Sequence, residues 1–295
     1  MIYKTGTEVP SGHGGALRIS FKTPPQMTDW QSMQDVWTLA DEIDIYSAGW
    51  TFDHFYPLQP ENRDGPCFEG WTTLAVLAGL TTRLRLGVMV SANPFRHPAV
   101  LANMAATLDV ASGGRVELGL GAGWYQVETD AYGLDLSPAR ERLDRLAEAC
   151  EVIDSLLTNA STTFAGRHYR VTDARCEPKA IQTPRPPFVI GGGGERRTLR
   201  IAAEWADQWN LASGPPDVFR RKLDILHEHC KAVGRDPSSI EPSVQIPAEN
   251  PGAAVDAVAA FAEVGAEHAV LVWRAPFDPR ALESVAERLR DLRVN

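Results

Sequence analysis

The stretch PFVIGGGGERRTLRIAAEWADQWNLA, residues 187 to 212, contains a short apolar run, four glycines, an amphipathic segment and a second apolar run. The apolar runs at 187–191 and 208–212 have the length of buried strands, and the segment 195–205 has the spacing of a helix. A strand, a helix and a strand in this order form a parallel pair joined by a right-handed crossover. Residues 187 to 212 therefore predict one strand–helix unit and the strand that opens the next unit.

The same alternation continues in both directions from this stretch. Apolar runs that predict strands lie at 17–22, 48–53, 84–90, 115–120, 187–191, 208–212, 242–246 and 268–273. Helical patterns follow these runs at 29–46, 70–81, 98–111, 138–158, 195–205, 215–233, 252–264 and 278–292. Eight such units without a linker predict one α/β domain over residues 17–295, a (β/α)8 TIM barrel with insertions. A doubly wound parallel sheet is the alternative fold.

Two segments fall outside this repeat. Residues 1–16 have no hydrophobic period, and we expect them to form a mobile N-terminal segment. Residues 158–187 are too long for an ordinary connection and predict a hairpin-like insertion around Gly166. This insertion either lies outside the barrel or helps to roof its mouth.

Composition excludes several classes of function. The 38 acidic and 29 basic residues give a net charge of −9, which argues against nucleic acid as the main partner. The four cysteines are far apart and have no zinc-binding spacing, so we expect reduced thiols and no metal. No apolar run is long enough for a membrane span, and the N-terminus lacks the order of a signal peptide. We therefore expect a cytoplasmic protein without a membrane partner.

Active sites of TIM barrels lie at the C-terminal ends of the strands, so the residues that follow each strand are the first candidates. The run 48–53 is followed by His54, which forms a titratable pair with Asp53. A histidine at this position can donate a hydrogen bond or transfer a proton near neutral pH. The alternative is a structural histidine that hydrogen-bonds to backbone.

The run 84–90 continues into a polar stretch. Ser91 and Asn93 offer hydrogen bonds to a polar heterocycle, and Arg96 and His97 offer charge to an anion. A turn at the Asn93-Pro94 dipeptide is the alternative explanation.

The run 115–120 leads into Gly121, Ala122, Gly123 and Trp124. Glycines at alternate positions let a ligand approach the backbone closely, and a tryptophan can stack on a flat ring. Tight packing at a barrel corner explains the same glycines equally well. The pattern lacks the last glycine of the dinucleotide fingerprint.

The four glycines at 191–194 stand immediately before the predicted helix 195–205. Free backbone N–H groups at a helix start, with Arg196, Arg197 and Thr198 beside them, favour a bound phosphate. A flexible loop is the alternative. The loop is not a Walker motif, because no GK[ST] follows it.

Three blocks of the sequence, taken together, resemble one known family. They are FDH at 52–54, the block from EGWTTLAVLAGL to GLGAGW at 69–124, and PRPPFVIGGGGERRTLRIAAEWADQWN at 184–210. The chain resembles the luciferase-like monooxygenase superfamily, and most closely its branch of coenzyme F420-dependent oxidoreductases. This resemblance covers residues 17–273 and implies a (β/α)8 barrel.

The resemblance implies a flavin or deazaflavin in the barrel mouth, with its phosphate at the glycine loop, here Gly191 to Gly194. It also implies a backbone bulge at 88–90, often with a non-proline cis peptide bond, that supports the ring. His54 matches the position that approaches the reactive ring face, and it is the catalytic residue that the resemblance implies. The cofactor-binding candidates are Asp53, Val88, Met89, Val90, Ser91, Asn93, Gly121, Ala122, Gly123, Trp124, Gly191, Gly192, Gly193, Gly194, Arg197 and Thr198.

The reaction that follows from the resemblance is hydride transfer between C5 of coenzyme F420 and a small organic substrate. The sugar-phosphate dehydrogenases of this branch carry a glutamate where this chain has Trp124, and a tryptophan near Leu58. Trp124 instead suggests an apolar pocket for a flat substrate. The alternatives are an FMN-dependent monooxygenase and a protein that binds the cofactor without turnover. Related barrels often form homodimers.

Overall fold

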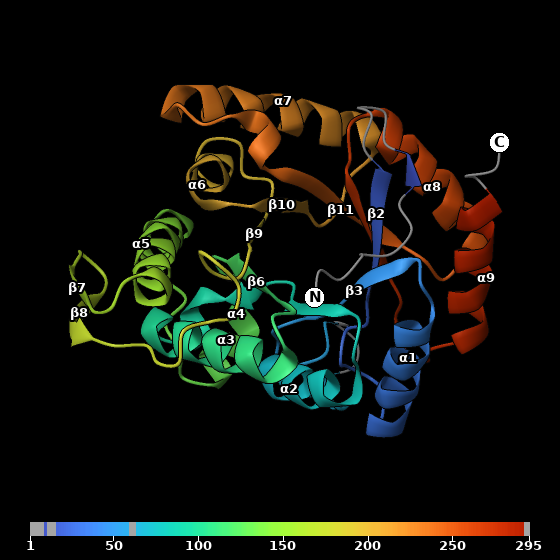
Figure 1. Ribbon diagram of the computed structural model, residues 1–295, viewed down its shortest axis with the longest axis horizontal. Coiled ribbons are helices and arrows are strands. Elements are labelled where there is room, and N and C mark those ends of the chain that lie inside the picture. The colour runs from blue at the N-terminus through green and yellow to red at the C-terminus, as the bar shows by residue number, and fades with distance from the viewer. Residues whose placement is uncertain (1–8, 11–15, 59–62, 292–295) are drawn as a thin grey trace.

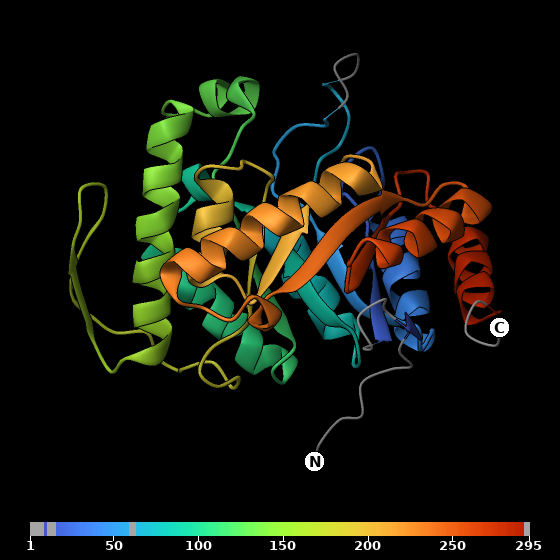
Figure 2. The ribbon, with the colours of Figure 1, turned by 90° about the horizontal axis from the view of Figure 1, so that it is seen from above.

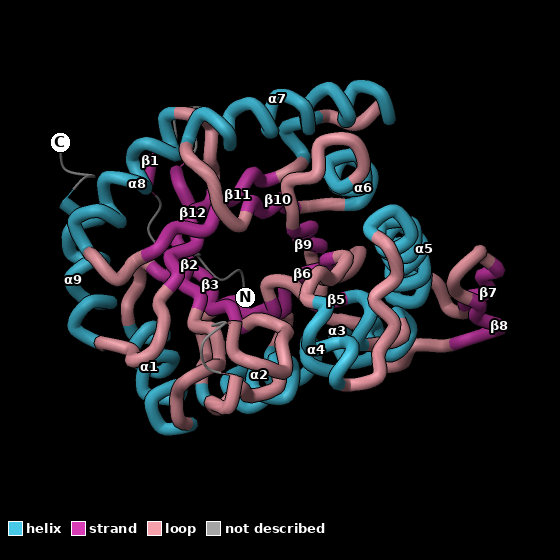
Figure 3. Tube along the Cα trace, turned by 180° about the vertical axis from the view of Figure 1, so that it is seen from behind, coloured by secondary structure: helices cyan, strands magenta, loops and turns pink. Residues whose placement is uncertain are grey.

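The computed structural model describes residues 9–10, 16–58 and 63–291. Parallel strands close into a barrel, each paired with the next and the last with the first, as Figure 3 shows end-on. In barrel order these strands are β2 (Ala16–Lys22), β3 (Tyr46–Thr51), β4 (Arg85–Val88), β6 (Val116–Gly121), β9 (Phe188–Gly191), β10 (Gln208–Leu211), β11 (Glu241–Pro247) and β12 (His268–Val272). The predicted (β/α)8 barrel is therefore confirmed.

Helices surround the barrel on its outer side (Figure 1). They are α1 (Trp30–Glu42), α2 (Gly70–Leu80), α3 (Pro98–Ser112), α5 (Ala139–Thr158), α6 (Thr198–Trp205), α7 (Pro216–Val233), α8 (Pro251–Glu263) and α9 (Pro279–Asp291). The short helix α4 (Gln126–Ala131) lies in the connection between β6 and α5. The short helices η1 (Asn93–Phe95) and η2 (Pro237–Ser239) lie in connections. Within the described residues, no helix combines the length and the apolar character that a bilayer crossing requires.

Along β2, apolar side chains that face the helices alternate with side chains that face the barrel interior. Leu17, Ile19 and Phe21 belong to the main core cluster between strands and helices. Phe21 meets Trp37 of α1 edge-on, with ring centroids 5.1 Å apart. The intervening residues, Arg18 among them, face the barrel interior, because successive side chains of a strand point to opposite sides.

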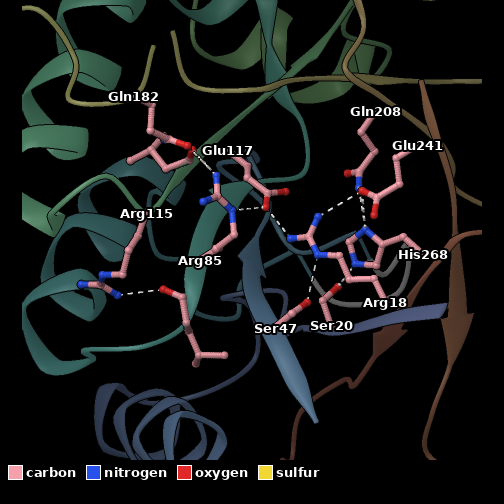
Figure 4. Close-up of polar contacts among 12 residues, drawn as sticks. Arg18, Ser20, Ser47, Arg85, Arg115, Glu117, Gln182, Gln208, Glu241 and His268 are labelled. Atoms are coloured by element: carbon pink, nitrogen blue, oxygen red, sulfur yellow. Dashed lines mark hydrogen bonds and ion pairs between the residues drawn. The ribbon is translucent and has the colours of Figure 1, made fainter. Parts of the chain in front are cut away.

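The N-terminal end of the barrel interior is polar (Figure 4). Arg18 donates hydrogen bonds to Glu117 of β6 and to Glu241 of β11, the latter at 3.0 Å. Nε2 of His268 lies 2.6 Å from Oγ of Ser20. Burial works to lower the pKa of Arg18, but the two carboxylates outweigh burial and raise it. This network ties four strands together beneath the apolar middle of the barrel.

The structure corrects four predicted boundaries. The helix expected at 29–46 ends at Glu42, and β3 begins at Tyr46 rather than at 48, because apolar residues of 43–46 suit either element. The helix expected from 195 begins at Thr198. The strand expected at 84–90 divides into β4 and the short β5 (Ser91–Ala92), and the Met89–Val90 peptide bond between them is cis.

The segment 158–187 contains an antiparallel hairpin of β7 (Thr162–Ala165) and β8 (Arg170–Ala174). The hairpin lies along the outer side of α5, as Figure 2 shows from above. Glu148 of α5 holds its turn by accepting hydrogen bonds from the N–H groups of residues 167–169. The hairpin therefore packs on a helix rather than over the barrel.

Most of the N-terminal segment expected to be mobile lies outside the described residues. Its described part, β1 (Val9–Pro10), pairs antiparallel with the start of β2.

Candidate active site

A cavity of about 470 Å³ opens at the C-terminal ends of the strands. Its volume is within the range of small-molecule and cofactor sites. Residues from most of the barrel strands and the loops after them line it: Lys22, Phe52, Asp53, His54, Leu58, Met89, Val90, Ala92, Phe95, Gly121, Ala122, Gly123, Trp124, Tyr125, Glu128, Thr129, Leu136, Leu143, Gly191, Gly192, Thr198, Asn210, Ala212 and Gln245.

His54 stands just beyond β3 and lines this cavity. Its Nδ1 atom lies 2.6 Å from Oε1 of Glu128, and Oε2 of Glu128 accepts the N–H of Phe55 at 2.8 Å. Glu128 is fully buried on the short helix α4. A carboxylate on Nδ1 places the proton there, so Nε2 is left for a ligand.

Aromatic rings fix the plane of the His54 imidazole. Its centroid lies 4.9 Å from the Phe52 ring, 5.8 Å from Trp124 and 6.1 Å from Tyr125. The side chain of Trp124 is 62% exposed, so one face of its indole is open at the cavity rim. The rim therefore presents a flat apolar surface beside the imidazole.

Asp53 lines the same cavity, but its carboxylate is engaged within the protein. Arg96 donates to both of its oxygens, at 2.6 and 3.0 Å, and the N–H of Ala92 donates at 2.9 Å. Burial raises the pKa of Asp53, and these donors oppose the rise. Arg96 also pairs with Glu69. The expectation that Arg96 meets a ligand anion is therefore corrected, because both of its acidic partners belong to the chain.

Residues 88–90, where the resemblance implies a backbone bulge, interrupt the strand: β4 ends at Val88, and the Met89–Val90 peptide bond is cis. A Cβ atom at Gly119 would collide with the carbonyl oxygen of Val88, and a Cβ atom at Gly121 or Gly191 would collide with the Val90 side chain. Glycine at 119 and 121 thus accommodates the bulge, which is the packing role weighed for these glycines. Gly121 and Gly123 also line the cavity, as ligand approach to the backbone requires.

Four candidates near the bulge lie away from the cavity. Val88 is buried, Ser91 accepts a hydrogen bond from Trp71 Nε1, and Asn93 donates to the Tyr169 hydroxyl of the hairpin at 3.0 Å. His97 is exposed and caps α3. Their polar groups act within the protein in this structure.

The glycine loop borders both the cavity and an adjoining open hollow. Gly191, Gly192 and Thr198 line the cavity. Leu143, Gly193, Gly194, Glu195, Arg196, Arg197, Thr198 and Lys222 line the hollow.

Local geometry requires glycine in this loop. Gly192 has a φ of +121°, and a Cβ atom on Gly193 would lie 2.9 Å from the Leu211 side chain. The carbonyl of Gly193 accepts from Lys222 Nζ at 2.7 Å. Within the described residues, no hydrogen bond uses the N–H of Gly193 or Gly194. These groups are free to meet an anion at the start of α6.

The Arg197 side chain is already engaged within the protein, whereas the sequence predicts that it contacts a phosphate. Its guanidinium pairs with Asp144 of α5 and donates to the Arg140 carbonyl at 3.0 Å. Arg196 is exposed beside it, and no ion pair of Arg196 occurs among the described residues.

Glu128, Lys22, Asn210 and Gln245 line the cavity without having been among the sequence-based candidates. Lys22, Asn210 and Gln245 occupy inward positions near strand ends. Once a barrel is assumed, polar residues at such positions could be predicted from the sequence to line the mouth. Glu128 lies several residues beyond its strand, so its position depends on the turn at 122–125.

A reactive thiol or a metal-binding cluster would be a further source of chemistry in the part of the chain that the structure describes. Burial and the charge of Glu128 raise the pKa of the Cys67 thiol to about 12, which disfavours a thiolate nucleophile. Across the described ranges, no group of three His, Cys, Asp or Glu side chains is placed to hold a metal ion.

A family model described as luciferase-like monooxygenase matches residues 16–292. The chain belongs to this family. As a member it is an oxidoreductase on a TIM barrel, which confirms the resemblance. The F420-dependent glucose-6-phosphate dehydrogenase of Kineococcus radiotolerans is 31% identical over 237 residues, which cover 79% of this chain and 68% of that protein.

Two solved structures show the same fold at low sequence identity. An F420-dependent secondary alcohol dehydrogenase in complex with an F420-acetone adduct has a TM-score of 0.84 at 17% identity, covering 94% of this chain and 99% of that one. Riboflavin lyase with modified FMN and riboflavin has a TM-score of 0.79 at 14% identity, covering 93% and 91%. The fold is therefore shared by proteins with different cofactors.

Proposed function

We propose that this family member is a coenzyme F420-dependent oxidoreductase that transfers a hydride between the deazaflavin and a small organic substrate. The observation that carries the proposal is the buried Glu128 carboxylate 2.6 Å from His54 Nδ1, inside a cavity that adjoins a glycine loop. The similarity to an F420-dependent dehydrogenase at 31% identity supports the choice of cofactor.

The described residues fit such a cofactor. The cavity has room for a flat ring beside the bulge at Met89–Val90, and the adjoining hollow suits a phosphate. Gly193 and Gly194 would hold the phosphate through backbone N–H groups, with Thr198 and Arg196 beside them. When bound, the deazaflavin supplies the hydride chemistry, and the protein supplies position and protons.

His54 is the proton-transfer residue of this proposal. Because Nδ1 is bonded to Glu128, Nε2 faces the ligand as the atom that gains or loses a proton. In alcohol oxidation, the hydroxyl proton goes to Nε2 as the carbon loses its hydride. In carbonyl reduction, Nε2 returns that proton to the oxygen.

The cavity wall favours a small, largely apolar substrate. Leu58, Phe95, Trp124 and Leu136 provide apolar surface in its lining, and the Trp124 ring lies beside His54. A small alcohol or carbonyl compound is therefore the substrate class that we propose.

Turnover in the absence of oxygen tests the proposal. A panel of small alcohols is mixed anaerobically with the protein and oxidised F420, and loss of the visible absorbance of the cofactor is followed. We expect bleaching by one or more alcohols at a rate that air does not change. Activity only with FMN, with oxygen uptake and labelled oxygen in the product, would contradict the proposal and identify a monooxygenase.

A further inference from the structure

Lys22 is a buried cation on the wall of the cavity. It is the last residue of β2, only 9% of its surface is exposed, and it lines the same cavity as His54. Its ammonium group can donate three hydrogen bonds and accept none. Nζ donates one of them to Oε1 of Gln245 at 3.0 Å.

Within the described residues, no carboxylate lies within ion-pair distance of Lys22 Nζ. Buried charges in proteins are normally paired, because an unpaired charge loses its hydration without compensation. Burial, together with repulsion from Arg274, lowers the pKa of Lys22 to about 8. The protein therefore keeps a destabilised cation at the cavity, which a bound anion would stabilise.

The neighbouring amides have fixed orientations that make this wall rich in donors. Because Lys22 only donates, the Gln245 oxygen must face it, and Gln245 Nε2 then donates to Oδ1 of Asn210 at 2.7 Å. Asn210 Nδ2 in turn donates to Oγ of Ser243 at 2.9 Å. Each amide nitrogen retains one further N–H, and Lys22 retains two.

This donor-rich wall differs from the apolar parts of the cavity lining. Lys22, Asn210 and Gln245 come from β2, β10 and β11, whereas Phe52, Phe95 and Trp124 supply apolar rings elsewhere in the lining. A ring with one apolar edge and one edge of carbonyl acceptors matches this division. The pyrimidinedione edge of a deazaflavin has two carbonyl oxygens. Addition of a hydride, with its electron pair, adds one negative charge to the ring, and the pyrimidinedione edge carries much of that charge.

We propose that Lys22, oriented by Gln245 and Asn210, pairs with the anionic pyrimidinedione edge of the reduced cofactor. This inference rests on the proposed function and deepens it. Lys22 would bind the reduced form more tightly than the oxidised form, whereas His54 acts on the substrate proton. The residue would thereby help to set the direction in which hydride transfer is favoured.

The test compares the affinity of the protein for the two redox forms. Wild-type protein, Lys22→Met and Lys22→Arg are titrated anaerobically by calorimetry with oxidised and with reduced F420. We expect Lys22→Met to weaken binding of reduced F420 by roughly 10- to 100-fold, the effect of one hydrogen bond to a charged group. Binding of oxidised F420 should change by less than about threefold, and Lys22→Arg should retain most of the preference.

Two controls keep the outcomes distinct. Lys231→Met removes the same charge from an exposed helix position and should alter neither affinity. Thermal unfolding should show that apo Lys22→Met is at least as stable as wild type, because the buried charge is gone. If wild type binds neither form, the proposed function fails. If wild type binds both but Lys22→Met leaves the ratio of affinities unchanged, only the role of Lys22 is overturned.

Discussion

His54 Nδ1 and Glu128 Oε1 lie 2.6 Å apart, although 74 positions separate the two residues in the chain. The contact joins the residue after β3 to the short helix α4 beyond β6. It favours a proton on Nδ1 and leaves Nε2 without a bond to this carboxylate, as in a carboxylate–histidine pair. Under the proposed function, proton transfer at His54 therefore depends on a carboxylate that does not itself need to touch the substrate.

Replacing Glu128 by Gln tests this positioning role. The amide keeps the shape but no longer favours a proton on Nδ1, so we expect turnover to fall by roughly 10² or more with little change in cofactor affinity. The pH profile of turnover should change as well, which a purely structural role would not cause. Steady-state kinetics over a range of pH provides the measurement.

The same substitution in a His54→Ala background provides the control. His54→Ala alone should lower turnover by roughly 10² to 10⁴, because it removes the proton carrier. Adding Glu128→Gln to this variant should then lower turnover hardly at all, because the effects of substitutions in residues that act as a unit are not additive. Full additivity of the two losses would show that Glu128 acts independently of His54.

Gly192→Val tests the glycine loop. The φ of +121° at Gly192 and the 3.1 Å approach of a Cβ atom to Thr198 disfavour a β-branched residue, so the loop must move. We expect F420 binding to weaken at least about tenfold, measured by fluorescence titration. Gly214→Val is the matched control, with a φ of +127° outside the cavity lining. Equal affinity of both folded variants for F420 would reject a phosphate site at this loop.

The ion pair between Arg96 and Asp53 should dominate the stability of the loop after β3. Arg96→Met leaves a buried carboxylate without its guanidinium, and we expect a loss of about 3–5 kcal/mol in the free energy of unfolding. The double variant Asp53→Asn/Arg96→Met should recover part of that loss. Urea unfolding measures both. A loss below about 1 kcal/mol for Arg96→Met, as for a surface pair, would refute this account.

The polar network at the base of the barrel predicts acid sensitivity. Burial works to raise the pKa of Glu241, but Arg18 and His268 outweigh it and lower that pKa from 4.5 to about 2. As the pH falls from about 4.5 to about 2, Glu241 binds a proton in the unfolded chain but not in the folded chain. The free energy of unfolding therefore decreases over this range. Glu241 should contribute up to about 3 kcal/mol of this loss.

Comparison of wild type with Glu241→Gln isolates that contribution. The variant should be less stable at neutral pH, because Arg18 loses a partner, and its free energy of unfolding should fall less steeply between about pH 4.5 and 2. Parallel stability curves for the two proteins across this range would contradict the assigned pKa.

The sequence predicted the barrel well because apolar runs and helical patterns alternate regularly. His54 was found because it directly follows an apolar run. Glu128 was not found, since the turn that carries it toward His54 has no periodic signal. The charge of Arg96 was visible, but its partners were not, because Asp53 and Glu69 approach it only in the folded chain.

The base of the barrel illustrates the same limit. A charged residue inside an apolar strand, such as Arg18 in LRISFK or Glu117 in RVELGL, indicates an inward polar position. Which strands share an ion pair depends on barrel closure, which brings together residues 99 positions apart in this case.

Cofactor binding tests the central claim most directly. The apoprotein is titrated anaerobically with F420 and, separately, with FMN, and binding is followed by fluorescence and calorimetry. We predict saturable, stoichiometric binding of F420 and at least about a hundredfold weaker binding of FMN. Tight binding of FMN together with no binding of F420 would contradict the account.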